Sequence, residues 1–249
     1  MKKMIVCLLV IFLFSLSPMK GMATELYITA EHYPPYSYKE NGRPTGFLVE
    51  LVHQIQEKIG EEKGEINFYP WARAYKQLQV GIADVLFPMG MTPERSAMFK
   101  FVGPVFWNDI YFYRLKGSSV VVESVEDARK VGKIAVTRDD LYHQTLRDMG
   151  FTNLDVSSSH KSDYLKLLKG RVDLLPMGER TLPHFLRAVP ELGANDLERV
   201  GPAIFFTTTY IAFSLKTPDA VIKKWQEALD DLKKGGNWNN IMDKYFPSS

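Results

Sequence analysis

Short apolar strands alternate with amphipathic helices along this chain, and the alternation starts a second time near its middle. The first run predicts strands at 26–30, 66–69 and 83–87, and helices at 47–59, 70–80 and from Pro93 onward. The second run predicts strands at 133–137, 154–157 and 172–175, and helices at 139–149 and 162–169. Strands joined through helices pair in parallel, with the helices covering the sheet. The chain is therefore predicted to form two α/β lobes with mostly parallel sheets.

Two further apolar segments, 108–115 and 203–215, are predicted to be strands that cross between the lobes. The first is aromatic rather than rich in Gly and Ser, which indicates an ordered connection instead of a flexible tether. Two crossing strands form a hinge, and a hinge between two α/β lobes creates a cleft. We assign 24–112 together with 209–249 to lobe 1 and 113–208 to lobe 2. Ligands of such sheets bind beyond the carboxyl ends of the strands, so the binding residues are expected there.

Residues 1–23 have the features of a secretory signal peptide. Lys2 and Lys3 precede an apolar run at 4–16, and Gly21 and Ala23 place small residues before a cleavage site. The apolar run is shorter than the roughly 20 residues that span a bilayer. We therefore expect cleavage after Ala23 and export to the periplasm; a retained signal anchor is the alternative.

Composition excludes several classes of function. Cys7, the single cysteine, lies in the leader, so the exported chain would have no disulfide and no cysteine metal site. Removal of the leader takes three of the 31 basic residues and none of the 29 acidic ones, which leaves a nearly neutral chain without a basic stretch. This balance argues against binding to nucleic acid or anionic lipid. The five histidines show no metal-site spacing, and we expect neither a metal nor a cofactor.

Seven short segments, in a specific order along the chain, carry a resemblance to a known family. They are Tyr33-Pro34-Pro35-Tyr36, Gly46-Phe47, Gly81-Ile82-Ala83-Asp84, Thr92-Pro93-Glu94-Arg95, Phe101-Val102-Gly103-Pro104, Gly170-Arg171-Val172-Asp173 and the tail from Ala228 to Phe246. In this order they resemble the family-3 extracellular solute-binding proteins, the polar amino-acid binders of ABC importers. Pro70-Trp71-Ala72-Arg73-Ala74 resembles a divergent branch of that family.

This resemblance implies the two-lobed periplasmic binding protein fold of type II, with two crossing hinge strands. It also implies capture of a small, carboxylate-bearing, amino-acid-like ligand by hinge closure, without chemistry on the ligand. The expected partners are that ligand and a membrane permease or receptor, and the chain is expected to act as a monomer.

Arg95 is the first candidate binding residue. It lies in the first turn of its helix, where the helix dipole disfavours a cation by about 0.3–1 kcal/mol. A guanidinium offers a planar fork that matches a carboxylate, and the resemblance assigns the α-carboxylate of the ligand to this arginine. The alternative is a surface arginine paired with an acid. A cation in the first turn of a helix goes against the dipole preference, and such an uncompensated departure indicates a functional site. We therefore favour ligand binding by Arg95.

Two aromatic residues, Tyr33 and Trp71, are candidate walls of the site. The resemblance places Tyr33 on the loop after the first strand and Trp71 at the start of a helix that faces the cleft. Flat rings can hold an apolar side chain, or a cation with about 0.5–2 kcal/mol of attraction. The alternative is core packing, which is the common fate of tryptophan; we expect packing for Tyr36.

A turn at 138–140 is the candidate contribution of the second lobe. Free backbone N–H groups at a helix start suit an anion, and the resemblance implies that this turn completes the carboxylate site. Arg138 and Asp140 are therefore candidate ligand contacts. Asp139 stands where many relatives have glycine, and a role as the helix N-cap is its alternative.

Two departures from the family pattern affect the ligand. Relatives carry an aspartate for the α-ammonium where this chain has Gly178, and Glu179 follows one residue later. Glu179 is a candidate replacement, or it occupies the first turn of a helix. Relatives also have Ser or Thr shortly before the T-x-x-R motif, where this chain has Pro88, Met89 and Gly90. Met89 and Gly90 remain candidate contacts.

Two other functions stay open on the sequence. The same family includes periplasmic dehydratases of prephenate-like acids, and such an enzyme would need an acid with a tuned pKa, for which Glu179 is the candidate. The third function is that of a sensory partner that presents its ligand to a membrane receptor.

Overall fold

The computed structural model describes residues 25–188 and 196–246 of the chain, and the predicted signal peptide lies outside these residues. The strands are β1 (Ile28–Ala30), β2 (Tyr38–Glu40), β3 (Arg43–Thr45), β4 (Ile66–Phe68), β5 (Val85–Gly90), β6 (Phe99–Leu115), β7 (Ile134–Thr137), β8 (Leu154–Ser157), β9 (Leu175–Gly178) and β10 (Leu197–Ser214). The helices are α1 (Phe47–Lys58), α2 (Trp71–Val80), α3 (Pro93–Met98), α4 (Val125–Ala128), α5 (Leu141–Asp148), α6 (His160–Leu168), α7 (Leu182–Ala188), α8 (Asp219–Lys234) and α9 (Asn237–Tyr245).

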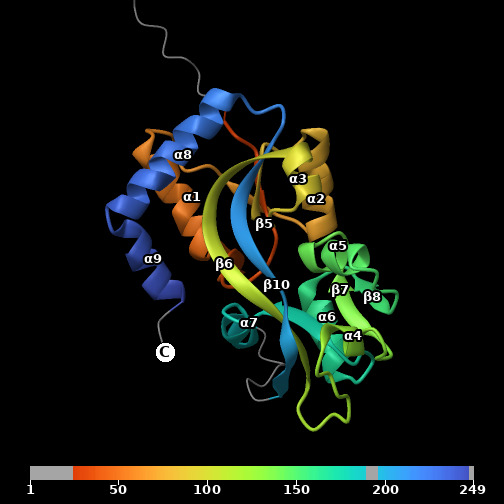
Figure 1. Ribbon diagram of the computed structural model, residues 1–249. Coiled ribbons are helices and arrows are strands. Elements are labelled where there is room, and N and C mark those ends of the chain that lie inside the picture. Colours follow the sequence, from red (N-terminus) through yellow and green to blue (C-terminus); the bar gives the residue numbers. More distant parts are fainter. Residues whose placement is uncertain (1–24, 189–195, 247–249) are drawn as a thin grey trace, which may run out of the picture.

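Two lobes face each other, and the long strands β6 and β10 run through both of them (Figure 1). In the first lobe β1 pairs in parallel with β4 and β5, as the alternation predicts. In the second lobe β7 pairs in parallel with β8. The two-lobed α/β fold expected from the sequence is confirmed.

The two crossing strands are longer than predicted and join the lobes through one continuous sheet. Its six strands have the order β4-β1-β5-β10-β6-β9, with β10 antiparallel to both β5 and β6. The register between β6 and β10 shifts at 200–205 and again at 209–211, and such irregularities bend a strand pair. The predicted lobe boundaries near 112 and 208 fall within these strands, and the exact assignment of residues to lobes stays a prediction.

Local chemistry explains where the helices near the cleft begin. Thr92 caps α3 by accepting the backbone N–H of Arg95 at 3.1 Å, and Pro93 follows at the first helical position. The expected helix at 139–149 begins later, at Leu141, because Asp140 is its N-cap and Asp139 has a φ of 58°. The expectation that Asp139 itself could be the cap is therefore wrong. Aspartate tolerates the left-handed backbone at this position.

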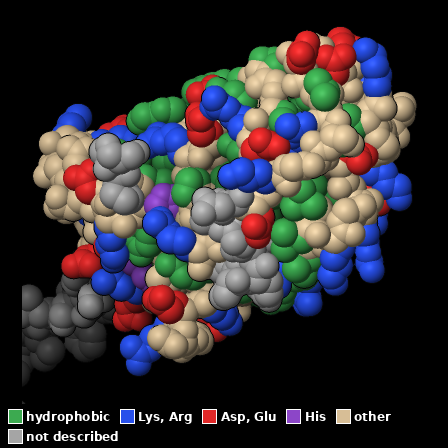
Figure 2. All heavy atoms as spheres, turned by 90° about the horizontal axis from the view of Figure 1, so that it is seen from below, with side chains coloured by type: hydrophobic (Ala, Val, Ile, Leu, Met, Phe, Trp, Pro, Cys, Tyr) green, Lys and Arg blue, Asp and Glu red, His purple; other side chains and the backbone are tan. Residues whose placement is uncertain are grey.

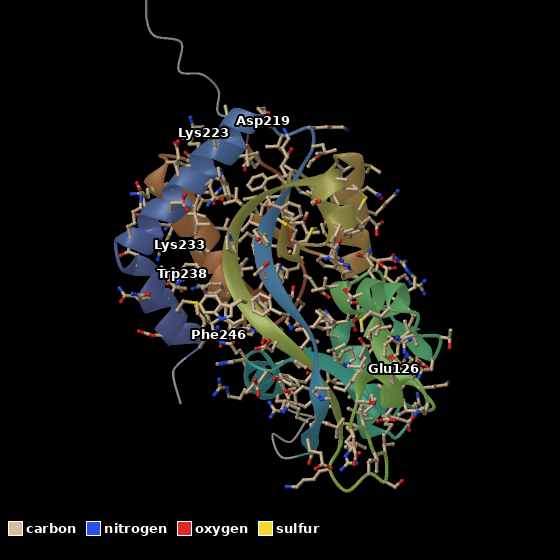
Figure 3. All side chains as sticks on the ribbon, in the orientation of Figure 1. Glu126, Asp219, Lys223, Lys233, Trp238 and Phe246 are labelled. Atoms are coloured by element: carbon tan, nitrogen blue, oxygen red, sulfur yellow. The ribbon has the colours of Figure 1, made fainter. Side chains whose placement is uncertain are left out.

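The largest hydrophobic core lies under the helices of the first lobe. Phe47 on α1 packs against Trp238 and Phe246, with ring centroids 5.4 and 5.5 Å away. Trp238 and Phe246 belong to the C-terminal part of the chain beside α8 (Figure 3). Trp225 on α8 is fully buried and meets Phe213 edge to face at 5.1 Å. The C-terminal helices therefore close the lobe that the N-terminal strands begin.

On the face seen in Figure 2, acidic and basic side chains are interspersed, without a large area of one sign. Within the described residues, no helix combines the length and apolar character needed to cross a membrane.

We predict that Trp225→Ala lowers the free energy of unfolding by about 3–5 kcal/mol, because it removes a fully buried ring and leaves a cavity. Urea denaturation of the mature chain measures the change. Trp107→Ala is the matched control, since Trp107 is 50% exposed and its loss should cost less than about 1 kcal/mol. Equal losses in the two variants would contradict this account of the core.

Candidate functional site

A cavity lies between the lobes, at the carboxyl ends of the strands. Its lining combines residues of both lobes and of the two crossing strands: Glu31, Tyr33, Tyr36, Trp71, Pro88, Gly90, Arg95, Asn108, Ile110, Asp140, Leu141, Tyr142, His160, Thr207 and Thr209. Glu31 directly follows β1, Asp140 lies just after β7, and His160 begins α6 after β8. The cavity is therefore where the topology of open α/β sheets places a ligand.

Arg95 is fully buried in this cavity and bridges the lobes. Its Nη1 donates to the carbonyl oxygen of Gly90 at 2.9 Å, within the first lobe. Its Nε donates to Oε1 of Gln144 at 3.0 Å, and its Nη2 donates to the carbonyl oxygen of Asp139 at 3.1 Å. Burial lowers the pKa of Arg95, and the nearby Tyr75 and Asp140 oppose that shift. All three observed acceptors are uncharged, although a buried guanidinium is best matched by an anion.

Trp71 lines the cavity beside Arg95 and also packs in a hydrophobic core cluster with Tyr75 and Leu78 of α2. Its indole Nε1 donates to the carbonyl oxygen of Asp139 at 2.6 Å, and its ring centroid lies 5.3 Å from the guanidinium carbon of Arg95. The Asp139 carbonyl therefore receives donors from two residues of the opposite lobe. This explains why the backbone at Asp139 must be held in its left-handed conformation.

Asp140 contributes a carboxylate to the cavity, where the sequence had suggested a backbone anion site. Its Oδ1 accepts the backbone N–H of His143 at 2.6 Å, so the helix start is already capped. Its Oδ2 is buried and has no hydrogen-bond partner. Burial raises the pKa of Asp140 to about 7, in spite of the nearby His160. The carboxyl group that Asp140 presents is suited to a cation, and the expected anion site at the backbone of this turn stays a prediction. Arg138 is exposed and does not line the cavity.

His160 lies in the middle of the acidic part of the cavity. Its ring stacks on Tyr33 with centroids 4.3 Å apart and an interplanar angle of 21°. Its Nε2 lies 3.6 Å from Oε2 of Glu31, and its Nδ1 lies 3.9 Å from Oδ2 of Asp140. Burial opposes protonation, but the charges of Glu31 and Asp140 outweigh it and raise the pKa of His160 to about 9. The side chain is therefore an imidazolium at neutral pH.

The tyrosines on the loop after β1 also reach across the cleft. The hydroxyl of Tyr33 lies 3.1 Å from that of Tyr142, and the hydroxyl of Tyr36 lies 3.0 Å from Oγ1 of Thr181. Asn108 Nδ2 donates to the same Thr181 oxygen at 2.7 Å. Tyr36 therefore lines the cavity and joins a polar network, in addition to the packing expected for it.

Glu179 is not brought to the cavity. It forms an ion pair with Arg199 and its side chain is 48% exposed. The neighbouring Gly178 explains why an acid is absent there: a Cβ at this position would lie 2.0 Å from Nδ2 of Asn108. Asn108 thus occupies the space that an aspartate would need. Met89 is fully buried and packs into the core cluster of α2 and β5, while Gly90 lines the cavity.

Glu31 and His160 were missed by sequence reasoning. Each lies at or close to the carboxyl end of a predicted strand, and this position could have indicated a binding residue because ligands of such sheets bind there. Among the described residues, no group of three or more His, Cys, Asp or Glu side chains is arranged to hold a metal ion.

The sequence pattern of the bacterial extracellular solute-binding proteins, family 3, matches residues 26–248. A probable histidine-binding protein of Campylobacter jejuni is 24% identical over 220 residues, which cover 87% of this chain and 82% of the relative. ABC transporter arginine-binding protein 1 of Escherichia coli is 25% identical over 220 residues, covering 86% of this chain and 87% of the relative. The match extends over both lobes.

Solved structures agree on the fold. An ancestral arginine-binding protein bound to arginine superposes with a TM-score of 0.78 at 24% identity, covering 89% of this chain and 97% of that chain. A histidine kinase sensor domain with similarity to periplasmic binding proteins also gives a TM-score of 0.78, at 23% identity, covering 88% and 95%. At 23–24% sequence identity, these similarities show a shared fold.

We predict that the free energy of unfolding falls as the pH rises from about 6.5 through 9. The folded-state pKa of His160 lies above its ordinary value, so its stabilisation is complete below pH 6.5 and is lost as the pH passes about 9. A shift of this size corresponds to up to about 3 kcal/mol. Urea denaturation at a series of pH values measures it.

In this series, His160→Gln should remove the part of the decline between about pH 8 and 9, whereas a decline near pH 7 should remain because burial raises the pKa of Asp140 to about 7. His53→Gln is the control, because burial lowers the pKa of His53 and its titration is complete below this window. A His160→Gln profile that keeps the full decline would show that another group is responsible.

Proposed function

The chain belongs to the bacterial extracellular solute-binding proteins, family 3, and we propose that it captures a small, carboxylate-bearing, amino-acid-like solute between its lobes for ABC-type uptake. The observation that carries this proposal is Arg95, a fully buried guanidinium that contacts both lobes across the cavity and has only uncharged acceptors there. A solute that supplies the anion would hold the lobes together through the same residue.

Arg95 can take the carboxylate of the solute. A guanidinium has five N–H donors, and three of them are used by Gly90, Gln144 and Asp139. The two that remain can donate to a carboxylate, and small shifts of the lobes would release more for a bidentate pair. Solute binding at Arg95 then favours the closed arrangement, because contacts from both lobes are made only in that state.

Asp140 supports an ammonium group on the same solute. Its Oδ2 is a buried acceptor without a hydrogen-bond partner, and His160 Nδ1 lies 3.9 Å away, beyond hydrogen-bond distance. A buried carboxylate is stabilised by a cation. This replaces Glu179 as the candidate for the ammonium. The flat rings of Tyr33 and Trp71 lie beside the cavity and suit the apolar part of the solute. Relatives that are named as histidine- and arginine-binding proteins support an amino acid as the solute class.

Delivery to a membrane permease from the periplasm fits the predicted signal peptide and the extracellular family. Glu179, the acid on which the dehydratase alternative rested, does not line the cavity, but Asp140 does, and burial raises its pKa to about 7. The proposed passive role therefore rests on the family match and not on the lack of a tuned acid. Incubation with prephenate tests this directly: formation of an aromatic product would overturn the passive role.

A thermal-shift screen of amino acids, other carboxylates and amines tests the proposed function. A ligand at 100 times its Kd should stabilise the mature protein by about 2.7 kcal/mol. Zwitterionic amino acids are expected among the hits. A screen in which amines bind and no carboxylate does would contradict the role of Arg95.

We predict that Arg95→Lys weakens the best carboxylate ligand by at least about tenfold, because lysine keeps the charge but loses the planar fork. Isothermal titration calorimetry measures the Kd. Arg73→Lys is the matched control, since Arg73 is exposed on α2 and stacks on Tyr69, outside the cavity. Undiminished affinity in Arg95→Lys would remove the guanidinium from the site.

A further inference from the structure

Two carboxylates enter the cavity, and one cation of the protein already lies between them. Glu31 and Asp140 are 5% and 4% exposed, and they come from opposite lobes. The ring of His160, also 5% exposed, lies 3.6 Å from one carboxylate and 3.9 Å from the other. Stacking on Tyr33 fixes the plane of this ring. The histidine therefore takes a place that a second cationic group of a solute would need.

Behind the ring lies a third buried carboxylate, Asp163, whose charge also raises the pKa of His160. Thr137 lies with Oγ1 3.3 Å from Nδ1 of His160, and it donates to Asp163 at 2.6 Å. Asp163 also accepts from Ser157, so hydroxyl donors satisfy both of its oxygens behind the ring. It does not line the cavity, and neither does any Lys. Tyr142 packs edge to face on His160 and carries no charge.

The charges of the closed cavity can then be paired one by one. Arg95 matches the carboxylate of a solute, His160 matches Glu31, and Asp140 is left for one ammonium. A buried charge without a partner is strongly unfavourable, so a second positive group on the solute would have no acid to meet. A zwitterion with an uncharged side chain leaves every charge that lines the cavity paired.

We propose that His160 is a specificity-determining residue that supplies an internal cation and restricts the site to amino-acid-like solutes with uncharged side chains. This inference rests on the proposed function for the carboxylate and ammonium of the solute. It separates this chain from its relatives named for histidine and arginine. Without the imidazolium, Glu31 would be free to bind a cationic side chain.

Calorimetric titration with matched solutes tests the proposal. Citrulline and arginine have side chains of similar size that differ in charge, and norvaline and ornithine form a shorter pair. The wild-type protein should bind the neutral member of at least one pair tenfold or more tightly than the cationic member. In His160→Gln the ratio should shift by at least tenfold toward the cationic member, whereas in His53→Gln it should stay unchanged.

A wild-type preference for arginine or ornithine would overturn the proposal, as would an unchanged ratio in His160→Gln. If no α-amino acid binds either protein, the proposed solute class is wrong. Whether His160 is a cation is then tested by a measurement that needs no solute.

That measurement is the NMR titration of the His160 side-chain nitrogens in the ligand-free wild-type protein. The imidazolium should persist beyond pH 8, and Glu31→Gln should move its titration to lower pH by removing the nearest carboxylate. If the ring titrates near pH 6.5 in the wild-type protein, His160 is not an internal cation. That result would overturn the proposal regardless of the affinities measured for the solutes.

Discussion

The antiparallel pairing of β6 with β10 holds the two lobes together. These strands run side by side from the first lobe into the second, so the chain passes between the lobes twice and the lobes face each other. A single connection would leave their relative orientation free. The paired strands instead limit the lobes to hinge motions that open or close one cleft. Their own residues Asn108, Ile110, Thr207 and Thr209 form part of its lining.

Within that cleft, buried charge explains the function better than shape does. Arg95, Glu31, Asp140 and His160 are all nearly inaccessible to solvent in the closed arrangement. Removing four ionisable groups from water is costly unless each finds a partner, and the protein alone does not provide a full set. The missing partners, an anion at Arg95 and a cation at Asp140, together describe a zwitterion. The closed state is therefore expected to be favoured when such a solute is present.

The fold could be predicted from the sequence because its signals are local and repeated. Apolar spacing, Gly81 after α2 and the Thr92 cap each agree with the same strand–helix order. Arg95 became a candidate because a cation is unusual in the first turn of a helix, whereas Trp71 became one through the resemblance to the family. Glu31 and His160 were harder to find, since an acid or histidine after a strand shows its role only when the opposite lobe is in place.

Adjacent residues set another limit on prediction. Nothing local distinguishes Asp139 from Asp140 as the helix cap, and the choice depends on Trp71 and Arg95 reaching the Asp139 carbonyl from the other lobe. Likewise, Glu179 is one residue from the expected acid position, but Asn108 occupies the space above Gly178. Both outcomes depend on contacts between segments that are far apart in the sequence.

Closure around a solute can be measured directly as a distance between the lobes. Apart from Cys7 in the leader the chain has no cysteine, so Lys76→Cys on α2 and Arg147→Cys on α5 would place just two spin labels, at exposed positions on opposite lobes. We predict that a ligand found by screening shifts the double electron–electron resonance distances to a single shorter population, and that Arg95→Lys weakens this shift. Saturating ligand that leaves the distance distribution unchanged would contradict capture by closure of the lobes.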